Sequence, residues 1–368
     1  MRLVIAGGGT GGHLFPGLAV ARAAKEAGER VLFISSGRAL ETGLLKEAGL
    51  PTARLSPRAF LGRGLGGKFL AILTLARETT KAIAILRSFK AQVVLGLGGY
   101  TSLPVILAAR ILRIPAAVHE QNAVPGLANR LAARVANKIL VSFEVSRRHF
   151  PAAKVVVTGN PVRLELQRPR TREIPHPCLL VLGGSQGARR LNQVLPETVA
   201  RLKKTWPNLT VIHQSGTGQE ESLRATYNRW GVPEAMVYPF ISDMAWAYAQ
   251  ADLVISRAGA TTSAELSCLG KPAILVPYPY AGGHQRENAR AFAEIGGALM
   301  MEERELTPAS LARVIKDLLQ DSRRLEIMAQ RARELWLWGD PGQILQELEN
   351  LLSDTEEAAC TRDSISTL

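Results

Sequence analysis

Short apolar runs alternate along the chain with longer amphipathic segments, starting at the first residues. Residues 3–6 form an apolar run that predicts a buried strand, and residues 16–27 have the apolar spacing of a helix. The glycine-rich segment GGGTGGH, residues 7–13, lies between them. A strand, a glycine loop and a helix in this order favour a site that binds an anionic ligand, with a tight turn that binds nothing as the alternative.

The same unit occurs a second time near the middle of the chain. Residues 178–182 are apolar, GGSQG follows at residues 183–187, and residues 188–203 again have a helical pattern. A repeated strand, glycine loop and helix favours the ligand-binding interpretation of both loops. It also predicts two halves of similar architecture.

Between these units the first half keeps alternating. The segment GLGGY, residues 96–100, is a third glycine-rich turn, and HEQN, residues 119–122, places polar side chains directly after an apolar run. Polar residues at the carboxyl ends of parallel strands lie where open α/β folds bind ligands. The expected strands are residues 29–35, 53–55, 92–97, 116–119, 138–141 and 154–157, and the expected helices are residues 40–48, 69–89, 102–112 and 126–136.

A proline-dense connection separates the halves. The segment TGNPVR, residues 158–163, is followed by Pro169, Pro175 and Pro177, with little periodicity. Beyond it the alternation resumes, and we expect an α/β protein of two doubly wound Rossmann-like domains that face each other across a cleft. The predicted boundaries are residues 1–163 for the first domain, 164–340 for the second, 341–352 for a helix that packs back on the first, and 353–368 for a disordered tail.

The bulk composition is that of a globular chain. Of its 368 residues 46% are hydrophobic, yet no stretch reaches the roughly 18 to 20 uninterrupted apolar residues that cross a bilayer. The first residues predict a strand rather than an export signal. The cysteines at positions 178, 268 and 360 match neither a disulfide framework nor a zinc spacing. We therefore expect a reducing, cytoplasmic setting.

Positive charge is concentrated in the first half. Residues 1–165 contain 23 Lys and Arg against 8 Asp and Glu, while the whole chain has a formal net charge of +13. This asymmetry indicates an anionic partner, and the scarcity of aromatic residues and recognition motifs argues against nucleic acid. The apolar helix expected at residues 69–89 has a basic rim, so it is either ordinary core or a surface for an acidic membrane.

The first glycine loop carries the first chemical candidate. His13 ends the loop and is a candidate general base, since a free imidazole has a pKa of about 6.5, with a structural role as the alternative. The loop lacks both the spaced dinucleotide fingerprint and the lysine of NTPase phosphate loops, so it fits looser recognition of phosphate or sugar. The sequence contains no Asp-x-Asp, and we expect neither a metal nor a cofactor.

The second half carries a candidate ribose site. The small-residue stretch SRAGATTSAE, residues 256–265, follows an apolar strand and ends in Glu265, one turn into the next expected helix. A carboxylate at that position accepts hydrogen bonds from both hydroxyls of a ribose. A long loop expected at residues 277–289 adds side chains that suit sugar hydroxyls, namely His284, Gln285 and Asn288.

Seven motifs together resemble one enzyme family: GGTGGH, GGY, HEQN, GNPVR, GGSQGA, RAGATTSAE and HQxxNA occur in its order and spacing. The similarity as a whole runs from Arg2 to about Leu352. The chain resembles the lipid II-forming N-acetylglucosaminyltransferases of peptidoglycan synthesis, which belong to glycosyltransferase family 28 and have the GT-B fold. The ordered set makes the resemblance specific, because any one motif alone is common.

The resemblance implies that residues 1–163 form an acceptor- and membrane-facing domain and that residues 164–340 bind a UDP-sugar. UDP-N-acetylglucosamine would be the donor, and undecaprenyl-diphosphate-linked muramyl pentapeptide, lipid I, the acceptor. The acceptor C4 hydroxyl would attack the anomeric carbon with inversion and without a metal or cofactor. The enzyme would be peripheral, on the anionic cytoplasmic face of the cell membrane, and would have no nucleic-acid partner.

The resemblance also implies roles for individual residues. His13 is the candidate base and lies with Tyr100 on the acceptor side, and Glu120 is a second catalytic candidate. Ile241 would border the uracil. The expected donor-binding residues are Thr10, Gly11, Gly12, Asn122, Arg163, Ser185, Ile241, Ala260, Thr261, Thr262, Ser263, Ala264, Glu265 and Gln285.

Two features depart from the family pattern. After GGY the family usually has a Ser-Gly-Pro turn, in which Leu103 replaces the glycine here, and the loop at residues 57–68 differs from the common sequence. Two other functions compete with the transferase. One is another reaction on the same donor, such as sugar epimerisation or transfer to a soluble acceptor. The other is a peripheral membrane scaffold with a vestigial nucleotide site.

Overall fold

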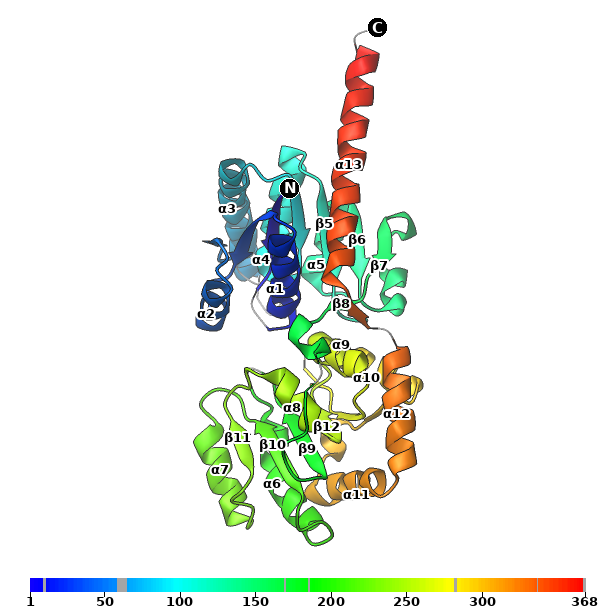
Figure 1. Cartoon of the computed structure of the whole chain (residues 1–368). Coiled ribbons are helices and arrows are strands. Elements are labelled where there is room, and N and C mark those ends of the chain that lie inside the picture. The colour runs from blue at the N-terminus through cyan, green and yellow to red at the C-terminus, as the bar shows by residue number, and fades with distance from the viewer. Residues whose placement is uncertain are drawn as a thin grey trace. The chain divides into compact units, whose positions relative to one another are not determined.

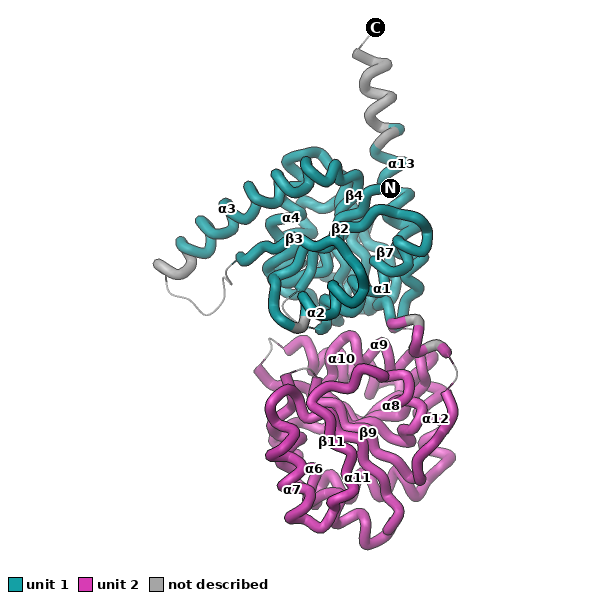
Figure 2. The backbone as a smooth tube through the Cα atoms, turned by 60° about the vertical axis from the view of Figure 1, so that its left-hand side comes forward, with its two compact units in different colours: residues 1–162, 338–368 teal, residues 163–337 magenta. Residues whose placement is uncertain are grey.

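The computed structural model describes residues 1–8, 11–57, 65–168, 170–184, 186–280, 283–335 and 337–366. Two compact units are present, teal and magenta in Figure 2. Unit 1 comprises Met1–Val162 and Trp338–Leu368, and unit 2 comprises Arg163–Leu337. The chain therefore passes between the units twice. Residues 338–340, which the sequence grouped with the second domain, belong to unit 1.

Unit 1 is built on a seven-stranded parallel sheet (Figure 1), whose strand order is β3-β2-β1-β4-β5-β6-β7. The order reverses between β1 and β4, which pair in parallel with Ala6 opposite Gly96. Ligands of open α/β sheets bind beyond the carboxyl ends of the strands at such a reversal. The strands are β1 (Arg2–Ala6), β2 (Arg30–Ser35), β3 (Thr52–Arg54), β4 (Val93–Gly96), β5 (Ala116–Glu120), β6 (Lys138–Val141) and β7 (Val155–Val157).

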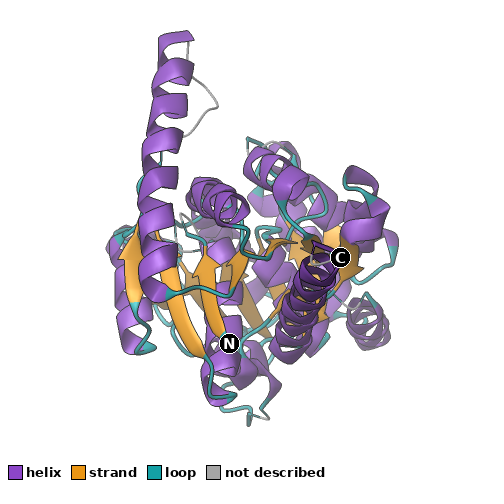
Figure 3. Ribbon diagram, turned by 90° about the horizontal axis from the view of Figure 1, so that it is seen from above, coloured by secondary structure: helices purple, strands orange, loops and turns teal. Residues whose placement is uncertain are grey.

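Helices cover both faces of this sheet, because successive strand residues point to opposite faces. Leu3 and Ile5 of β1 pack in one core with α1 and α13, whereas Val4 and Ala6 pack in another with α3, α4 and α5. Figure 3 shows helices, in purple, flanking the orange strands. The helices are α1 (Gly11–Glu26), α2 (Ala39–Glu47), α3 (Leu65–Phe89), α4 (Gly99–Leu112), α5 (Leu127–Val135) and α13 (Pro341–Ser366), with 3-10 turns at Glu144–His149 and Ala152–Lys154.

Two helices of unit 1 begin earlier than the sequence pattern predicts. The pattern places the start of α1 at Pro16 and that of α4 at Ser102, but the helices begin at Gly11 and Gly99. Pro16 and Pro104 each occupy the sixth helical position, where the missing N–H removes a single intrahelical hydrogen bond. Gly11, Gly12 and Gly99 thus belong to first helical turns rather than to loops.

The C-terminal helix α13 packs on unit 1. Ile344, Leu345, Leu348 and Leu351 enter the same core as α1, and Lys138 forms an ion pair of 2.8 Å with Glu347. The sequence predicts a disordered tail after residue 352, but α13 continues to Ser366. No glycine or proline interrupts residues 343–366, and Glu and Ala have high helix propensity, so the chain has no signal to end the helix.

Unit 2 repeats the doubly wound pattern with a six-stranded parallel sheet of order β11-β10-β9-β12-β13-β14. The order reverses between β9 and β12, which pair with Leu182 opposite Ser256. The strands are β9 (Cys178–Leu182), β10 (Thr210–Gln214), β11 (Met236–Tyr238), β12 (Leu253–Ser256), β13 (Ala273–Leu275) and β14 (Ala298–Met300). The helices are α6 (Arg189–Lys203), α7 (Glu220–Arg229), α8 (Met244–Gln250), α9 (Ala260–Leu269), α10 (His284–Glu294), α11 (Pro308–Leu319) and α12 (Ser322–Glu334), with 3-10 turns at Leu164–Gln167 and Glu303–Glu305.

Helix α10 corrects the prediction of a long loop at residues 277–289. The helix begins at His284, directly after Gly283 with a φ of +79°, and buries Asn288, Ala289 and Phe292. The loop therefore ends six residues earlier than its polar composition indicates.

The two segments of unit 1 that lead into and out of unit 2 pair with each other as a small parallel sheet. Strand β8 (Asn160–Pro161) pairs with β15 (Trp338–Gly339). A Cβ on Gly159, whose φ is +69°, would lie only 2.5 Å from the carbonyl oxygen of Trp338. Glycine is required there because both the close approach and the positive φ exclude a side chain.

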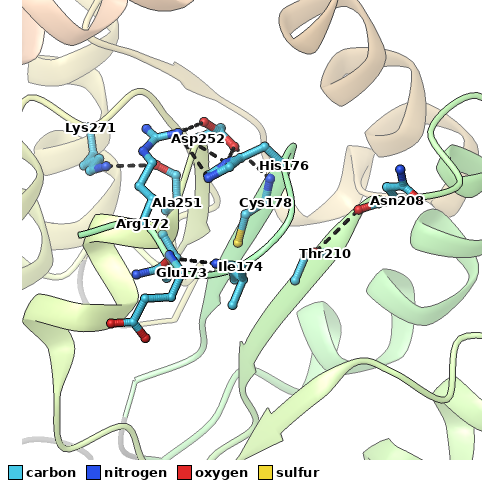
Figure 4. Close-up of polar contacts among 11 residues, drawn as sticks. Arg172, Glu173, Ile174, His176, Cys178, Asn208, Thr210, Ala251, Asp252 and Lys271 are labelled. Atoms are coloured by element: carbon cyan, nitrogen blue, oxygen red, sulfur yellow. Dashed lines mark hydrogen bonds and ion pairs between the residues drawn. The ribbon is translucent and has the colours of Figure 1, made fainter. Parts of the chain in front are cut away.

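The connection that follows the first crossing is fastened to unit 2 (Figure 4). Asp252, just before β12, accepts hydrogen bonds from Arg172, from His176 and from the backbone N–H of Cys178. Burial opposes ionisation of Asp252, but the hydrogen bonds from His176, Cys178 and Arg172 outweigh it and lower its pKa. Lys271 donates to the carbonyl of the neighbouring Ala251 over 2.9 Å.

Candidate active site

His13 lies in the first turn of α1, beyond the carboxyl end of β1. The turn between β4 and α4 approaches its ring through Gly98 and Gly99, with φ angles of +95° and +70°. A Cβ on Gly98 would lie 3.2 Å from His13 Cε1, and one on Gly99 would lie 3.8 Å from Nε2. Because both residues are glycine, neither places a side chain against the ring. Tyr100, the other predicted acceptor-side residue, follows them in the first turn of α4.

Glu120 is buried and receives several hydrogen bonds. Its oxygens accept from the Asn122 backbone N–H at 2.9 Å and side-chain amide at 3.1 Å, from the Gly126 N–H at 3.3 Å, and from Asn129 Nδ2 at 2.8 Å. Ser146 donates to the Asn122 carbonyl over 2.9 Å. The carboxyl group therefore organises the loop that carries Asn122, the predicted contact of the donor sugar.

The remaining polar residues of HEQN form a buried chain of contacts with His13. Gln121 Oε1 lies 3.1 Å from His13 Nδ1, and Gln121 Nε2 lies 3.0 Å from His119 Nδ1. The other ring nitrogen of His119 lies 2.9 Å from the Gly159 carbonyl oxygen. This series of contacts thus connects the first turn of α1 with Gly159, the residue before β8.

Unit 2 places Glu265 inside α9, 3% exposed, between two side chains that bind it. Arg163 donates to Oε1 over 2.8 Å, and the Tyr248 hydroxyl donates to Oε2 over 2.9 Å. Burial together with the Glu265 charge raises the pKa of Tyr248 well above its ordinary value, so the hydroxyl remains a donor. Burial would lower the pKa of Arg163, but Glu265 reverses this effect and raises it.

The side chains in the first turns of α9, which are predicted to bind the nucleotide, differ in their exposure to solvent. Thr261 and Thr262 are half-buried, whereas Ala260, Ser263 and Ala264 are buried. Gly259 precedes the helix as its N-cap, and the helix N-terminus offers backbone N–H groups and a partial positive charge. This end of α9 suits an anionic or hydroxyl-bearing ligand.

Two further residues that are predicted to bind the sugar-nucleotide donor take part in hydrogen bonds that involve backbone N–H groups. Ile241, 5% exposed, donates its N–H to Gln214 Oε1 over 3.0 Å. Gln285, at the start of α10, accepts from the Tyr278 N–H over 3.0 Å, and Asn288 donates to the Ala258 carbonyl over 3.0 Å. The Asn288 contact ties α10 to the residue before the N-cap of α9. Gly11 and Gly12 open α1, whereas Thr10 and Ser185 lie outside the described residues.

Tyr248 and Gln121 are among the members of these clusters that sequence reasoning missed. Gln121 stood inside a motif but received no role, because no local pattern shows that its amide meets His13. Tyr248 lies in the short helix MAWAYAQ, where an aromatic residue is typical of core. Only its placement 17 positions before Glu265 in a repeated β/α unit was available as a signal.

Across residues 1–366, with the gaps stated above, no group of three or more His, Cys, Asp or Glu side chains could hold a metal ion. Among the described helices, none has the length and apolar content needed to cross a membrane.

Comparison with known proteins matches both units. Residues 3–141 match the glycosyltransferase family 28 N-terminal domain, and residues 178–335 match its C-terminal domain. A relative from Syntrophotalea carbinolica is 44% identical over 354 residues, which cover 95% of this chain and 99% of the relative. The chain belongs to glycosyltransferase family 28.

A second relative and a solved structure match over more than nine tenths of the chain. A relative from Geobacter metallireducens is 41% identical over 91% of this chain and 94% of its own length. Both relatives carry the name UDP-N-acetylglucosamine--N-acetylmuramyl-(pentapeptide) pyrophosphoryl-undecaprenol N-acetylglucosamine transferase. The crystal structure of Acinetobacter baumannii MurG matches with a TM-score of 0.75 at 33% identity, over 95% of this chain and 99% of that chain.

A more distant likeness shows the fold alone. The UDP-GlcNAc 2-epimerase from Neisseria meningitidis has a TM-score of 0.66 at 14% identity, over 95% of this chain and 100% of that chain. This likeness is one of fold only, and a shared fold does not by itself distinguish a transferase from an epimerase.

Proposed function

We propose that this family 28 glycosyltransferase transfers N-acetylglucosamine from UDP-N-acetylglucosamine to the C4 hydroxyl of lipid I, giving lipid II and UDP. The observation that carries the proposal is the 44% identity along 95% of the chain to a relative whose name states this sugar and this lipid-linked acceptor. The likeness includes both units, so the predicted acceptor residues and the predicted donor residues all fall within it.

In this proposal unit 2 binds the nucleotide. Glu265 accepts hydrogen bonds from the ribose hydroxyls. Each of its carboxylate oxygens has a further lone pair besides the one that accepts from Arg163 or Tyr248. Ile241 borders the uracil, and Thr261 and Thr262 line the approach. Ser185, the remaining donor residues of α9 and Gln285 contact phosphate and sugar hydroxyls.

The chemical step needs a base on the acceptor and stabilisation of the leaving group. The acceptor oxygen forms a bond to the anomeric carbon while the bond to the β-phosphate oxygen breaks, so the configuration inverts and UDP leaves with the electron pair. His13 takes the hydroxyl proton. Backbone N–H groups of the glycine segments, Gly11 and Gly12 among them, balance the diphosphate charge without a metal. Thr10 and Asn122 contact the donor.

We assign Glu120 to positioning rather than to proton transfer. Its contacts with Asn122, Gly126 and Asn129 use both oxygens within the protein. A carboxylate held in this way orders the Asn122 loop. Tyr100 and the Gly98–Gly99 turn contact the acceptor in this proposal, on the same side as His13.

An anionic membrane surface is the proposed location of the acceptor. Helix α3 exposes Phe69, Leu70, Ile72 and Leu73, which are 64%, 42%, 57% and 51% exposed. Arg77 and Lys81 follow on the same helix with exposed side chains. Apolar side chains next to basic ones on one helix suit the boundary between acyl chains and anionic headgroups. The protein would thus be peripheral to the cytoplasmic leaflet of the cell membrane.

Product analysis in two reactions tests the proposal. The protein is given UDP-N-acetylglucosamine alone, and then the same donor with a lipid I analogue. We expect UDP release only when the analogue is present. Conversion of the donor sugar to its C2 epimer without any acceptor would instead establish the epimerase alternative.

A further inference from the structure

The amide of Gln121 lies between two imidazole rings in unit 1. Its oxygen is 3.1 Å from His13 Nδ1, and its nitrogen is 3.0 Å from His119 Nδ1. The side chain is buried, and its nitrogen also lies 2.9 Å from the carbonyl oxygen of Leu97. Each of these contacts joins a donor to an acceptor, so together they restrict which ring nitrogens carry hydrogen.

The surrounding carbonyl groups fix the orientation of the amide. The oxygens of Leu97 and His119 lie 2.9 Å and 3.2 Å from one end of the Gln121 side chain, and a carbonyl oxygen accepts but never donates. That end must therefore be the NH2 group. The opposite end, which faces His13, is the amide oxygen and can only accept.

His119 supports the same assignment from its other side. Its Nε2 lies 2.9 Å from the Gly159 carbonyl oxygen, so Nε2 carries the hydrogen and donates. Burial lowers the pKa of His119 to about 4, so the ring is neutral near pH 7 and its Nδ1 has a lone pair. That lone pair accepts from the Gln121 NH2 group, which agrees with the orientation set by the carbonyl groups.

We infer that Gln121 is a positioning residue that holds neutral His13 in the tautomer with hydrogen on Nδ1 and the lone pair on Nε2. The inference rests on the proposed role of His13 as the base. Because the Gln121 oxygen can only accept, His13 Nδ1 must donate to it. The hydroxyl proton of the acceptor then passes to Nε2, the oxygen keeps the electron pair, and the resulting imidazolium still donates from Nδ1 to Gln121.

The glycine turn is consistent with Nε2 as the working nitrogen. A Cβ on Gly99 would lie 3.8 Å from His13 Nε2, and its φ of +70° already disfavours a side chain. Gly99, which has no side chain, therefore lies beside the edge of the ring that carries Nε2. Free neutral histidine mainly carries its hydrogen on Nε2, so the tautomer inferred here is one that the protein must impose.

Nitrogen-15 NMR of ring-labelled protein tests the tautomer without any turnover. At a pH above the titration of His13, we expect its Nδ1 to have the shift of a protonated nitrogen and its Nε2 the shift of an unprotonated one. The His13→Gln protein lacks these signals and so assigns them. Hydrogen on Nε2 in the unaltered protein would overturn the inference. Absence of transferase activity would overturn the proposed function but leave this result standing.

The Gln121→Met protein tests whether Gln121 sets the tautomer. We expect the His13 signals to move towards the Nε2–H form and kcat to fall at least about tenfold, with the donor KM within about threefold. The control Gln250→Met removes another buried glutamine that bonds to backbone, in unit 2, and should leave kcat unchanged. Unchanged His13 signals in the folded Gln121→Met protein would contradict the role, and if that variant does not fold, the wild-type spectrum decides.

Discussion

Arg163 and Glu265 stand 102 positions apart in the sequence, yet the guanidinium donates to the carboxylate over 2.8 Å. Arg163 is the first residue of unit 2, directly after the chain leaves unit 1. The proposed ribose ligand is thus tied to the segment where the chain passes between the units. Tyr248 binds the other oxygen of the carboxylate, so its orientation is set from two sides.

Removing the Tyr248 hydroxyl tests whether this orientation serves the donor. In Tyr248→Phe, Glu265 loses one of its two fixed contacts, and we expect the donor KM to rise about tenfold, the effect of about 1.4 kcal/mol. The lipid I KM should change little. The control Tyr227→Phe removes another buried hydroxyl of unit 2, which contacts His213 over 2.9 Å. Equal effects of both variants on the donor KM would contradict a specific role for Tyr248.

His213 predicts how the stability of unit 2 depends on pH. Burial lowers its pKa to about 3, whereas an unfolded histidine titrates near 6.5. Between these pH values the unfolded chain binds a proton that the folded chain does not. The contribution of neutral His213 to the free energy of unfolding is therefore complete above about pH 6.5 and is lost as the pH falls towards 3. Denaturant titrations followed by the fluorescence of Trp206, Trp230 and Trp246 measure this loss.

The His213→Gln protein removes that titration. Its free energy of unfolding at pH 7 should be lower, because the contacts with Tyr227 and Asn192 are lost. On acidification from pH 7 to pH 4 it should lose about 3 kcal/mol less than the unaltered protein. Parallel acid profiles for the two proteins would show that His213 is not the cause.

Asp252 predicts a second stability effect, in the connection between the units. Asp252→Asn replaces an acceptor of three hydrogen bonds and should cost about 2 kcal/mol of unfolding free energy. Asp243 is the matched control, since its ion pair with Arg170 is about half exposed and asparagine preserves its N-cap of α8. Asp243→Asn should therefore change stability by less than about 0.5 kcal/mol, and a similar loss in both variants would contradict the account.

Helix α3 predicts binding to lipid surfaces. Replacing Phe69 and Ile72 together by serine should weaken binding to vesicles that contain an anionic phospholipid by at least about tenfold, as measured by sedimentation. Raised salt should weaken the binding of the unaltered protein as well. Trp230→Ser, which removes a 46% exposed aromatic residue from unit 2, is the control. Equal loss in the control, or equal binding to uncharged vesicles, would refute an electrostatic and apolar membrane face on α3.

The double α/β architecture follows from the sequence because the buried strands are short apolar runs and because β1, β4 and β9 are each followed by a glycine-rich turn and a helix. The helix starts were less predictable. Because proline is most favourable at the first helical position, the sequence pattern predicts that α1 begins at Pro16, which is five residues too late. In the structure Pro16 is tolerated at the sixth helical position. The polar composition after residue 277 similarly concealed the start of α10, whose apolar contacts begin only at Ala289.

The polar clusters were predictable only in part. Motifs indicated His13, Glu120 and Glu265, because polar residues after strands point to the carboxyl edge of a sheet. Their partners could not be deduced in the same way. The contact of Gln121 with His13 spans 108 positions, and that of Arg163 with Glu265 spans 102. Such pairs depend on how separate strands and helices pack, which local periodicity does not encode.

Disaccharide formation is the measurement that tests the central claim most directly. Purified protein is mixed with radiolabelled UDP-N-acetylglucosamine, a lipid I analogue and a metal chelator, and the lipid product is analysed by mass and by the configuration of its new linkage. We expect one N-acetylglucosamine added to the muramyl sugar with inverted anomeric configuration, and at least about 100-fold less product from His13→Ala. No disaccharide from substrates that a known family 28 transferase converts would contradict the account.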